Sequence, residues 1–263
     1  AENLLRYRDD HVAFVFRGET QKSAKITYAD LYNRVARLAR SLREMGVAPG
    51  DRVGAYMPNL PETAIAMLAA TSIGAMWASC GAELGAAAVL DRLRQIEPKV
   101  LFTADGYFYK AKTFDTLLNA ETVAKGIGSL KKVVVVTYTS EKPDITNIPN
   151  SVRYDEFLAT EKEAQIGFEQ LPFDHPLYIM FSSGTTGKPK CMIQGTGGVL
   201  INHLKDLMLH SDLKRQDGIT YITSASWMMW HWLMCSLAVG ATIVLYDGNP
   251  NHPDWGAMWR LVQ

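Results

Sequence analysis

Residues 51–79, DRVGAYMPNLPETAIAMLAATSIGAMWAS, contain the pattern that decides the fold. A strand is predicted over Arg52–Met57, and it is followed by a helix with Pro61 in its first turn and Gly74 just past its end. The short apolar run 75–79 predicts a second buried strand. Because a helix between two strands normally forms a right-handed crossover, the two strands are expected to be parallel and in one sheet.

The same alternation continues on both sides of this unit. Upstream, Thr27 and Asp30 form a capping-box-like start for a helix that ends near Gly46. The further elements predicted are helices over 85–96 and 197–210 and strands over 99–103, 131–138 and 175–181. Four consecutive valines in 131–138 are typical of a strand covered on both faces. We therefore expect an α/β fold of mainly parallel sheets flanked by helices, with residues 1–263 in a single α/β region.

Composition excludes several classes of protein. Of the 263 residues, 48% are hydrophobic, and 27 Lys and Arg residues balance 27 Asp and Glu residues. No basic field therefore favours nucleic acid or an anionic membrane as a partner. Cys80, Cys191 and Cys235 are odd in number and far apart, so they fit neither a disulfide framework nor a metal site. This cysteine usage predicts a cytoplasmic protein without a structural metal.

Two segments depart from the simple alternation. The stretch 219–246 lacks Asp, Glu, Lys and Arg and is long enough to span a bilayer. Its Gly240 and its β-branched end favour a buried strand–helix–strand instead. The stretch 139–174 is polar and rich in proline, so we predict a surface excursion with a short helix over 154–161. The last residues, NPNHPDWGAMWRLVQ, begin an amphipathic helix, so we expect a longer parent protein.

The loop FSSGTTGKPKC, residues 181–191, follows a predicted strand and precedes a predicted helix. Its glycines permit close approach to a ligand, its hydroxyls can donate hydrogen bonds, and its lysines supply positive charge. The spacing of the glycines excludes a Walker P-loop. Composition alone leaves a phosphate-binding loop and a surface turn both open. The candidate phosphate-binding residues are Ser182, Ser183, Gly184, Thr185, Thr186, Gly187, Lys188 and Lys190.

This loop resembles the signature phosphate-binding loop of the adenylate-forming superfamily, which includes acyl-CoA synthetases, peptide-synthetase adenylation domains and luciferases. It differs at Phe181, where Tyr is common, and at Cys191, where Gly is usual. Residues 26–69 resemble the amino-terminal segment of short-chain acyl-CoA synthetases. Residues 72–107 and 224–233 are more particular, and they resemble the branch of the superfamily that activates acetoacetate. The fold implied is part of the large amino-terminal domain of an adenylate-forming enzyme.

The resemblance implies a two-step reaction. A carboxylate attacks the α-phosphorus of MgATP to give an acyl adenylate and pyrophosphate, and the thiol of coenzyme A then displaces AMP. ATP, Mg²⁺ and coenzyme A are therefore the expected cofactor and co-substrates. By position, Trp227, Met228 and Met229 line the acyl pocket, although such a cluster is also typical of a core. His231 either meets a polar group such as a β-keto oxygen or is a core histidine.

The sequence also departs from the superfamily pattern. The adenine-binding segment, the Tyr-Gly-x-Thr-Glu stretch with its magnesium ligand, the ribose-binding Asp and the catalytic Lys of the small carboxy-terminal domain are expected downstream of the matched regions. The chain is therefore expected to be an inactive fragment of the ligase. Two alternatives stay open: a ligase for acetate, propionate or another short acid, and a non-catalytic nucleotide- or phosphate-binding module. The sequence leaves the oligomeric state open.

Overall fold

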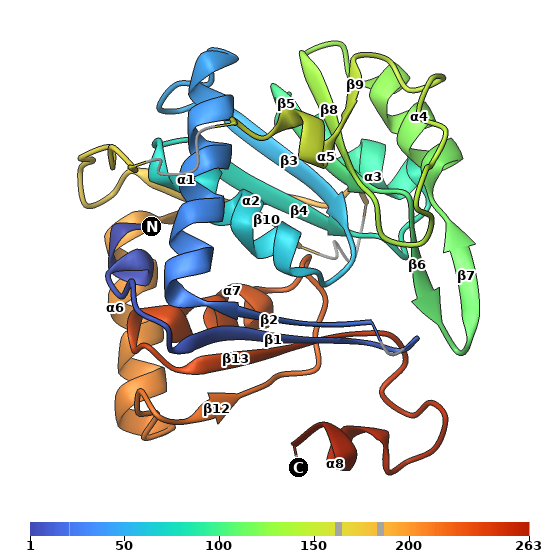
Figure 1. Cartoon of the computed structure of the whole chain (residues 1–263). Helices are drawn as coiled ribbons and strands as arrows, with labels where there is room; N and C mark the ends of the chain where they lie inside the picture. Colours follow the sequence, from blue (N-terminus) through green and yellow to red (C-terminus); the bar gives the residue numbers. More distant parts are fainter. Residues whose placement is uncertain (21, 161–164, 183–186, 263) are drawn as a thin grey trace.

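A computed structural model describes residues 1–20, 22–160, 165–182 and 187–262 (Figure 1). Within these residues a large sheet has, in order, the strands β11 (Cys191–Gly195), β10 (Pro176–Phe181), β4 (Met76–Gly81), β3 (Arg52–Met57), β5 (Val100–Ala104), β8 (Lys132–Val136) and β9 (Ser151–Arg153). A smaller sheet has the order β12 (Gly218–Ile219), β13 (Thr242–Asp247), β1 (Val12–Gly18) and β2 (Ser23–Thr27). A separate hairpin joins β6 (Gly106–Tyr109) and β7 (Lys112–Asp115).

The two sheets are mainly parallel, as predicted. All neighbouring pairs in the described part of the large sheet are parallel except β10 with β11. The helices are α1 (Tyr28–Glu44), α2 (Pro61–Ser72), α3 (Ala86–Leu93), α4 (Leu117–Gly126), α5 (Tyr154–Phe157), α6 (Thr196–Lys205), α7 (Met228–Met234) and α8 (Ala257–Val262). Short 3₁₀ segments, η1 (Glu2–Leu5) and η3 (Cys235–Ala238), and a π-helical turn, η2 (Asp206–His210), complete the described elements.

Helix α2 lies at the centre of the main core. Eleven of its twelve residues are buried, so the helix has no solvent face. The hydroxyls of Thr63 and Thr71 donate to backbone carbonyls at 2.8 Å, which satisfies these buried polar groups. The surrounding cluster joins α1 and α2 to residues of both sheets, such as Val53 of β3 and Ile243 of β13. A helix that is apolar on all sides therefore fills the space between two sheets.

The other face of the large sheet is covered by α3 and α4 (Figure 1). The valines of β8 are divided between the two cores: Val133 and Val135 face α3 and α4, whereas Val134 belongs to the cluster around α2. This division confirms that β8 is a strand covered on both faces.

Several local predictions are confirmed. The backbone N–H of Asp30 donates to the Thr27 hydroxyl at 3.1 Å, which caps α1. Residues 219–246 form the end of β12, then α7, η3 and β13, the predicted strand–helix–strand order. None of the helices in the described ranges combines the length and the apolar composition that crossing a bilayer requires.

Two predicted elements differ from the structure. The helix predicted over 85–96 spans Ala86–Leu93 and continues as turns through Ile96; Pro98 disfavours a helical conformation at Glu97, whose φ is 46°. The stretch 139–174, predicted as a surface excursion, also contributes the edge strand β9, which pairs with β8. The short helix predicted there is α5, which ends at Phe157. A three-residue strand gives almost no local signal, because it is too short to show an alternation of apolar and polar residues.

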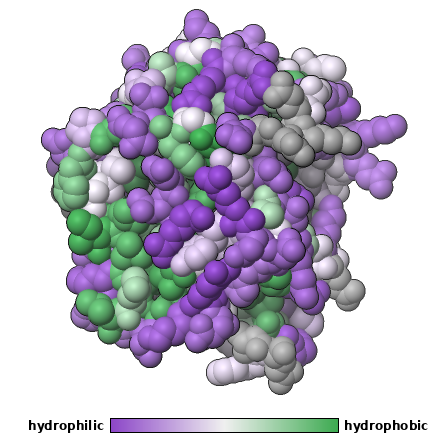
Figure 2. Space-filling view, turned by 60° about the vertical axis from the view of Figure 1, so that its left-hand side comes forward, coloured by the Kyte–Doolittle hydropathy of each residue, from purple (hydrophilic) through white to green (hydrophobic). Residues whose placement is uncertain are grey.

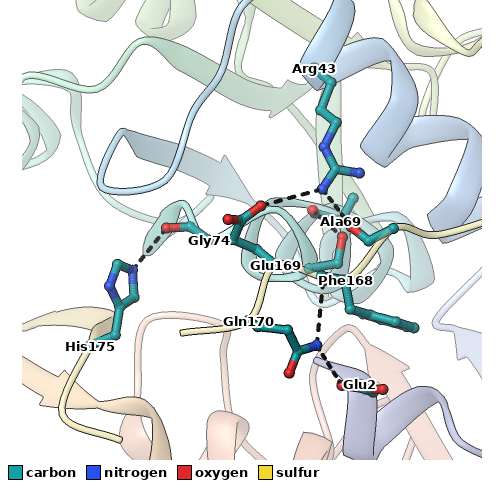
Figure 3. Close-up of polar contacts among 10 residues, drawn as sticks. Glu2, Arg43, Ala69, Gly74, Phe168, Glu169, Gln170 and His175 are labelled. Atoms are coloured by element: carbon teal, nitrogen blue, oxygen red, sulfur yellow. Dashed lines mark hydrogen bonds and ion pairs between the residues drawn. The ribbon is translucent and has the colours of Figure 1, made fainter. Parts of the chain in front are cut away.

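The segment before β10 is fixed to the first half of the chain (Figure 3). The ring of His175 lies 3.0 Å from the Gly74 carbonyl, just past α2. The Arg43 guanidinium of α1 is 3.9 Å from the Glu169 carboxylate, and Gln170 donates to the Glu2 carboxylate at 3.3 Å. These contacts fix the start of β10 and therefore the position of the loop at its end.

Exposed apolar side chains are concentrated in the second half of the chain. Among the described residues, twelve of the fifteen large exposed apolar side chains follow residue 172, including Ile193 of β11, Ile201 of α6 and Trp255 and Trp259 near α8. Figure 2, in which the side bearing α6 comes forward, shows apolar surface gathered on one part of that face. The second half therefore leaves more apolar surface exposed than the first half.

Buried Asp105 connects the ends of two neighbouring strands. Its carboxylate follows β5, is 2% exposed, and accepts the backbone N–H groups of Tyr138, Thr139 and Ser140 at 2.7, 2.9 and 2.7 Å. These three residues follow β8, the neighbour of β5. The carboxylate therefore holds the carboxyl ends of both strands in register.

We expect Asp105→Asn to lower the free energy of unfolding by about 2–4 kcal/mol, because an amide cannot accept from all of these buried donors. Urea unfolding of the chain measures this loss. Asp144→Asn is the matched control, since exposed Asp144 accepts only within its own turn, from Thr146. Equal stability of the two variants would contradict the assigned role of Asp105.

Candidate functional site

Strands β10, β4 and β3 are parallel neighbours, so their carboxyl ends meet at one edge of the large sheet. This edge, called here the carboxyl edge, carries the loop after β10, the turn after β4 and the turn after β3. Ligands of open parallel sheets bind at this kind of edge.

The candidate phosphate loop connects two strands. The sequence predicted a strand, the loop and then a helix, but β11 follows the loop and α6 begins only at Thr196. Phe181 pairs with Cys191, the Ser182 N–H donates to the Lys190 carbonyl at 3.0 Å, and the Lys190 N–H donates to the Ser182 hydroxyl at 3.3 Å. A hairpin, not a helix start, therefore holds the loop. Strand β11 was missed because it is short and half exposed.

The structure describes Ser182, Gly187, Lys188 and Lys190 of the predicted phosphate-binding residues. The predictions for Ser183, Gly184, Thr185 and Thr186 lie outside the described residues. The Lys188 side chain is 80% exposed, and its ammonium lies 4.0 Å from the Asp91 carboxylate of α3. An exposed ion pair at this distance is weak. Lys188 can therefore exchange Asp91 for a more highly charged anion.

The predicted acyl-pocket residues lie where α7 begins. Trp227 and Met228 are 63% and 50% exposed, whereas Met229 is half-buried and His231 is buried.

Three contacts attach this segment to the carboxyl edge. The Ala225 carbonyl accepts from the Ser79 hydroxyl of β4, and the Ser224 hydroxyl lies 3.4 Å from the Glu83 carboxylate in the turn after β4. The Trp230 indole N–H donates to Asn59, after β3, at 2.8 Å. The structure thus brings both predicted residue groups to the ends of neighbouring strands.

His231 belongs to the core behind this segment. Its Nδ1 lies 3.2 Å from the Trp227 carbonyl oxygen, and the centroid of its ring lies 4.3 Å from the ring centroid of Tyr178. Burial lowers the pKa of His231 to about 4, so the imidazole is neutral near pH 7. Because Nδ1 must carry the proton to donate to a carbonyl, Nε2 is an acceptor. A β-keto oxygen is also an acceptor, so this arrangement favours the core interpretation of His231.

A cavity of about 180 Å³ opens at the same edge, beside the turns after β3 and β4 and the end of β13. Its polar lining includes Asn59, Glu83, Tyr107, Ser224, Tyr246 and Asp247. Burial, with Glu19 nearby, raises the pKa of Asp247 to about 6. Sequence reasoning missed these residues, because single polar residues at strand ends give no pattern until the strands are placed side by side. Within the described ranges, no group of three His, Cys, Asp or Glu residues is arranged to hold a metal ion.

Comparison with known proteins places these features in context. The family model described as AMP-binding enzyme matches residues 1–263. An acetoacetyl-CoA synthetase from Danio rerio is 48% identical over 270 residues, covering 100% of this chain and 40% of that protein. A malonamoyl-CoA synthetase from Penicillium aethiopicum is 39% identical, covering 95% of this chain and 36% of that protein. The solved structure of acetoacetyl-CoA synthetase from Streptomyces lividans matches with a TM-score of 0.92 and 42% identity, covering 99% of this chain and 40% of that one.

The chain therefore spans about 40% of the length of relatives that it matches from end to end. The fold agreement extends over nearly all of this chain, so the relative placement of the two residue groups belongs to the shared architecture.

The raised pKa of Asp247 predicts a pH dependence of stability. The folded chain holds this proton more tightly than the unfolded chain, so the contribution of the group to stability falls as the pH rises through 4 to 6. Asp247→Asn removes the titration. Relative to the wild type, the variant should gain about 1 kcal/mol of unfolding free energy between pH 5 and pH 7.5.

Urea unfolding at the two pH values tests this gain. In the control Asp144→Asn, no such gain is expected, because Thr146 lowers the pKa of Asp144 below its ordinary value and hence below this range. A constant difference between wild type and Asp247→Asn at both pH values would refute the assignment.

Proposed function

Because this chain belongs to the AMP-binding enzyme family, we propose that it is part of an ATP-dependent ligase that joins acetoacetate to coenzyme A. The acid is activated as an acyl adenylate and then transferred to the thiol, giving acetoacetyl-CoA, AMP and pyrophosphate. One observation carries the proposal: the loop after β10 and the segment at the start of α7, about forty residues apart in sequence, both lie at the carboxyl edge formed by β10, β4 and β3. The names of the Danio rerio and Streptomyces lividans relatives support acetoacetate as the acid.

The phosphate loop would hold the β- and γ-phosphates of ATP. Acid and ATP are both anions, so catalysis depends on positioning and on neutralising charge. The exposed ammonium groups of Lys188 and Lys190, with the hydroxyl of Ser182, supply these contacts among the described residues. We assign Ser183, Gly184, Thr185, Thr186 and Gly187 to the same role from the loop pattern.

Trp227, Met228 and Met229 would line the acyl pocket. Trp227 and Met228 are at least half exposed at the carboxyl edge, which supports contact with a ligand more than a role in core packing. Methionine side chains are flexible and adapt to small acids. The malonamoyl-CoA synthetase is consistent with this pocket, since its acid differs from acetoacetate only by an amide in place of the methyl ketone.

The remaining assignments concern the whole protein. We propose that the chain forms the amino-terminal subdomain and part of the next, and that the small carboxy-terminal domain and the magnesium ligand lie in the downstream part. Coenzyme A is then the second co-substrate, and the enzyme acts in the cytoplasm on small molecules, with neither nucleic acid nor membrane as partner. The free, buried thiols of Cys80 and Cys235 support a reducing compartment.

Acid-dependent exchange of labelled pyrophosphate into ATP tests the proposed function. The full-length protein should exchange well with acetoacetate and much less with acetate or propionate. The 263-residue chain alone should give neither exchange nor acyl-CoA, because it covers about 40% of the length of its relatives and the catalytic Lys of the superfamily is expected downstream. Preference for another acid would keep the mechanism and replace the substrate. Absence of exchange with every acid would instead favour a non-catalytic phosphate-binding module.

The acyl pocket is tested by Met228→Ala in the full-length protein. Loss of several apolar atoms next to the acid should raise the KM for acetoacetate roughly tenfold. Met208→Ala is the matched control, because Met208 of η2 is 48% exposed, almost the same as Met228, but lies outside the carboxyl edge. A similar change in KM for both variants would remove Met228 from the pocket.

A further inference from the structure

The phosphate loop is attached to the turn that follows α3, and we propose that Gln95 in this turn is a positioning residue for the loop, with Cys191 as its partner on β11. The inference rests on the proposed function, since the ligand of the loop is taken to be the phosphate chain of ATP. It adds the residues that hold the loop in place to those that contact the ligand.

The carboxamide of Gln95 uses both of its polar atoms in these contacts. Its Nε2 donates to the carbonyls of Pro189 at 2.9 Å and Asp91 at 2.6 Å. Its Oε1 accepts from the thiol of Cys191 at 3.6 Å. The opposite orientation of the amide would place its oxygen against two carbonyl oxygens, so the observed orientation is the one that matches donors to acceptors. One side chain thus connects α3, the loop and β11.

The hydrogen bond from Gln95 to Pro189 holds the loop at the peptide between its two lysines. It lies between Lys188 and Lys190, the two cations of the loop, and as a proline it has no N–H. Its carbonyl is therefore its one backbone hydrogen-bonding group, and Gln95 donates to it. Asp91, in the last turn of α3, lies 4.0 Å from the ammonium of Lys188. The end of α3 therefore orients the peptide between the two lysines and also contacts one of them.

Cys191 makes a side-chain contact with Gln95 that glycine, the usual residue at this position, cannot make. The superfamily loop usually has Gly at this position, and Gly has no side chain to reach Gln95. Here the Cys191 side chain packs beside the apolar cluster of α3 and α4, and its thiol donates to the amide. The substitution at the end of the loop therefore accompanies a specific attachment of β11 to the end of α3.

The full-length protein with Gln95→Met tests the inference by two measurements. Loss of these hydrogen bonds should speed alkylation of Cys191 by iodoacetamide about three- to tenfold and raise the KM for ATP by a similar factor, with a smaller change in kcat. Cys191 is the suitable thiol, because it is half-buried whereas Cys80 and Cys235 are 0% and 2% exposed. Gln216→Met is the matched control, since Gln216 is exposed in the turn before β12.

Conservative variants separate positioning from a general structural role. Cys191→Ser keeps a donor and should retain the KM for ATP, whereas Cys191→Gly should raise it as Gln95→Met does. Unchanged alkylation in Gln95→Met, or faster alkylation with an unchanged KM for ATP, would overturn the inference. If the wild type shows no acid-dependent exchange, the proposed function fails. Alkylation with and without ATP or pyrophosphate then decides the inference: protection in the wild type that is weakened in Gln95→Met supports it, and equal rates overturn it.

Discussion

Burial of α2 on every side is the constraint on which the rest of the structure depends. A helix without a solvent face must be enclosed, and the large sheet, α1 and the small sheet enclose it. The small sheet can do so only because β13, from the far end of the chain, pairs with β1 near its beginning. The same packing places β4 directly after α2, between β3 and β10. The three strands whose ends form the carboxyl edge therefore also belong to the core around this one apolar helix.

The candidate site is built from the ends of these strands. Contacts from β3 and β4 hold the start of α7, through Asn59 and Ser79, while β10 leads into the phosphate loop. A hairpin and the end of α3 hold the loop. Because strand β11, and not a helix, follows the loop, its positive charge comes from Lys188 and Lys190 without the contribution of a helix dipole. Under the proposed function, electrostatic contact of the loop with polyphosphate would depend on how firmly the loop is held.

The unequal burial of the two halves fits the share of the relatives that this chain covers. The first half has covered both faces of its sheet, whereas β11, α6, α7 and α8 retain exposed apolar side chains. Such surface is costly to leave in water and is normally covered by further protein. Relatives that match the chain throughout are about two and a half times as long, since it covers 40% of them. We therefore expect the isolated chain to self-associate more readily than the parent protein.

The sequence by itself determined the local elements and singled out the candidate site residues. Periodicity and caps placed α1, α2, β3 and β8, and the composition of residues 181–191 together with the resemblance predicted the phosphate loop. Tertiary structure alone decided the short edge strands β9 and β11, the parallel pairing of β13 with β1, and the contact of Gln95 with Pro189 and Cys191. It also placed His231 in the core with an accepting Nε2. The reason is physical: a cap or an apolar stripe acts within a few residues, whereas a short strand or a single polar side chain acquires its partner only when distant segments meet.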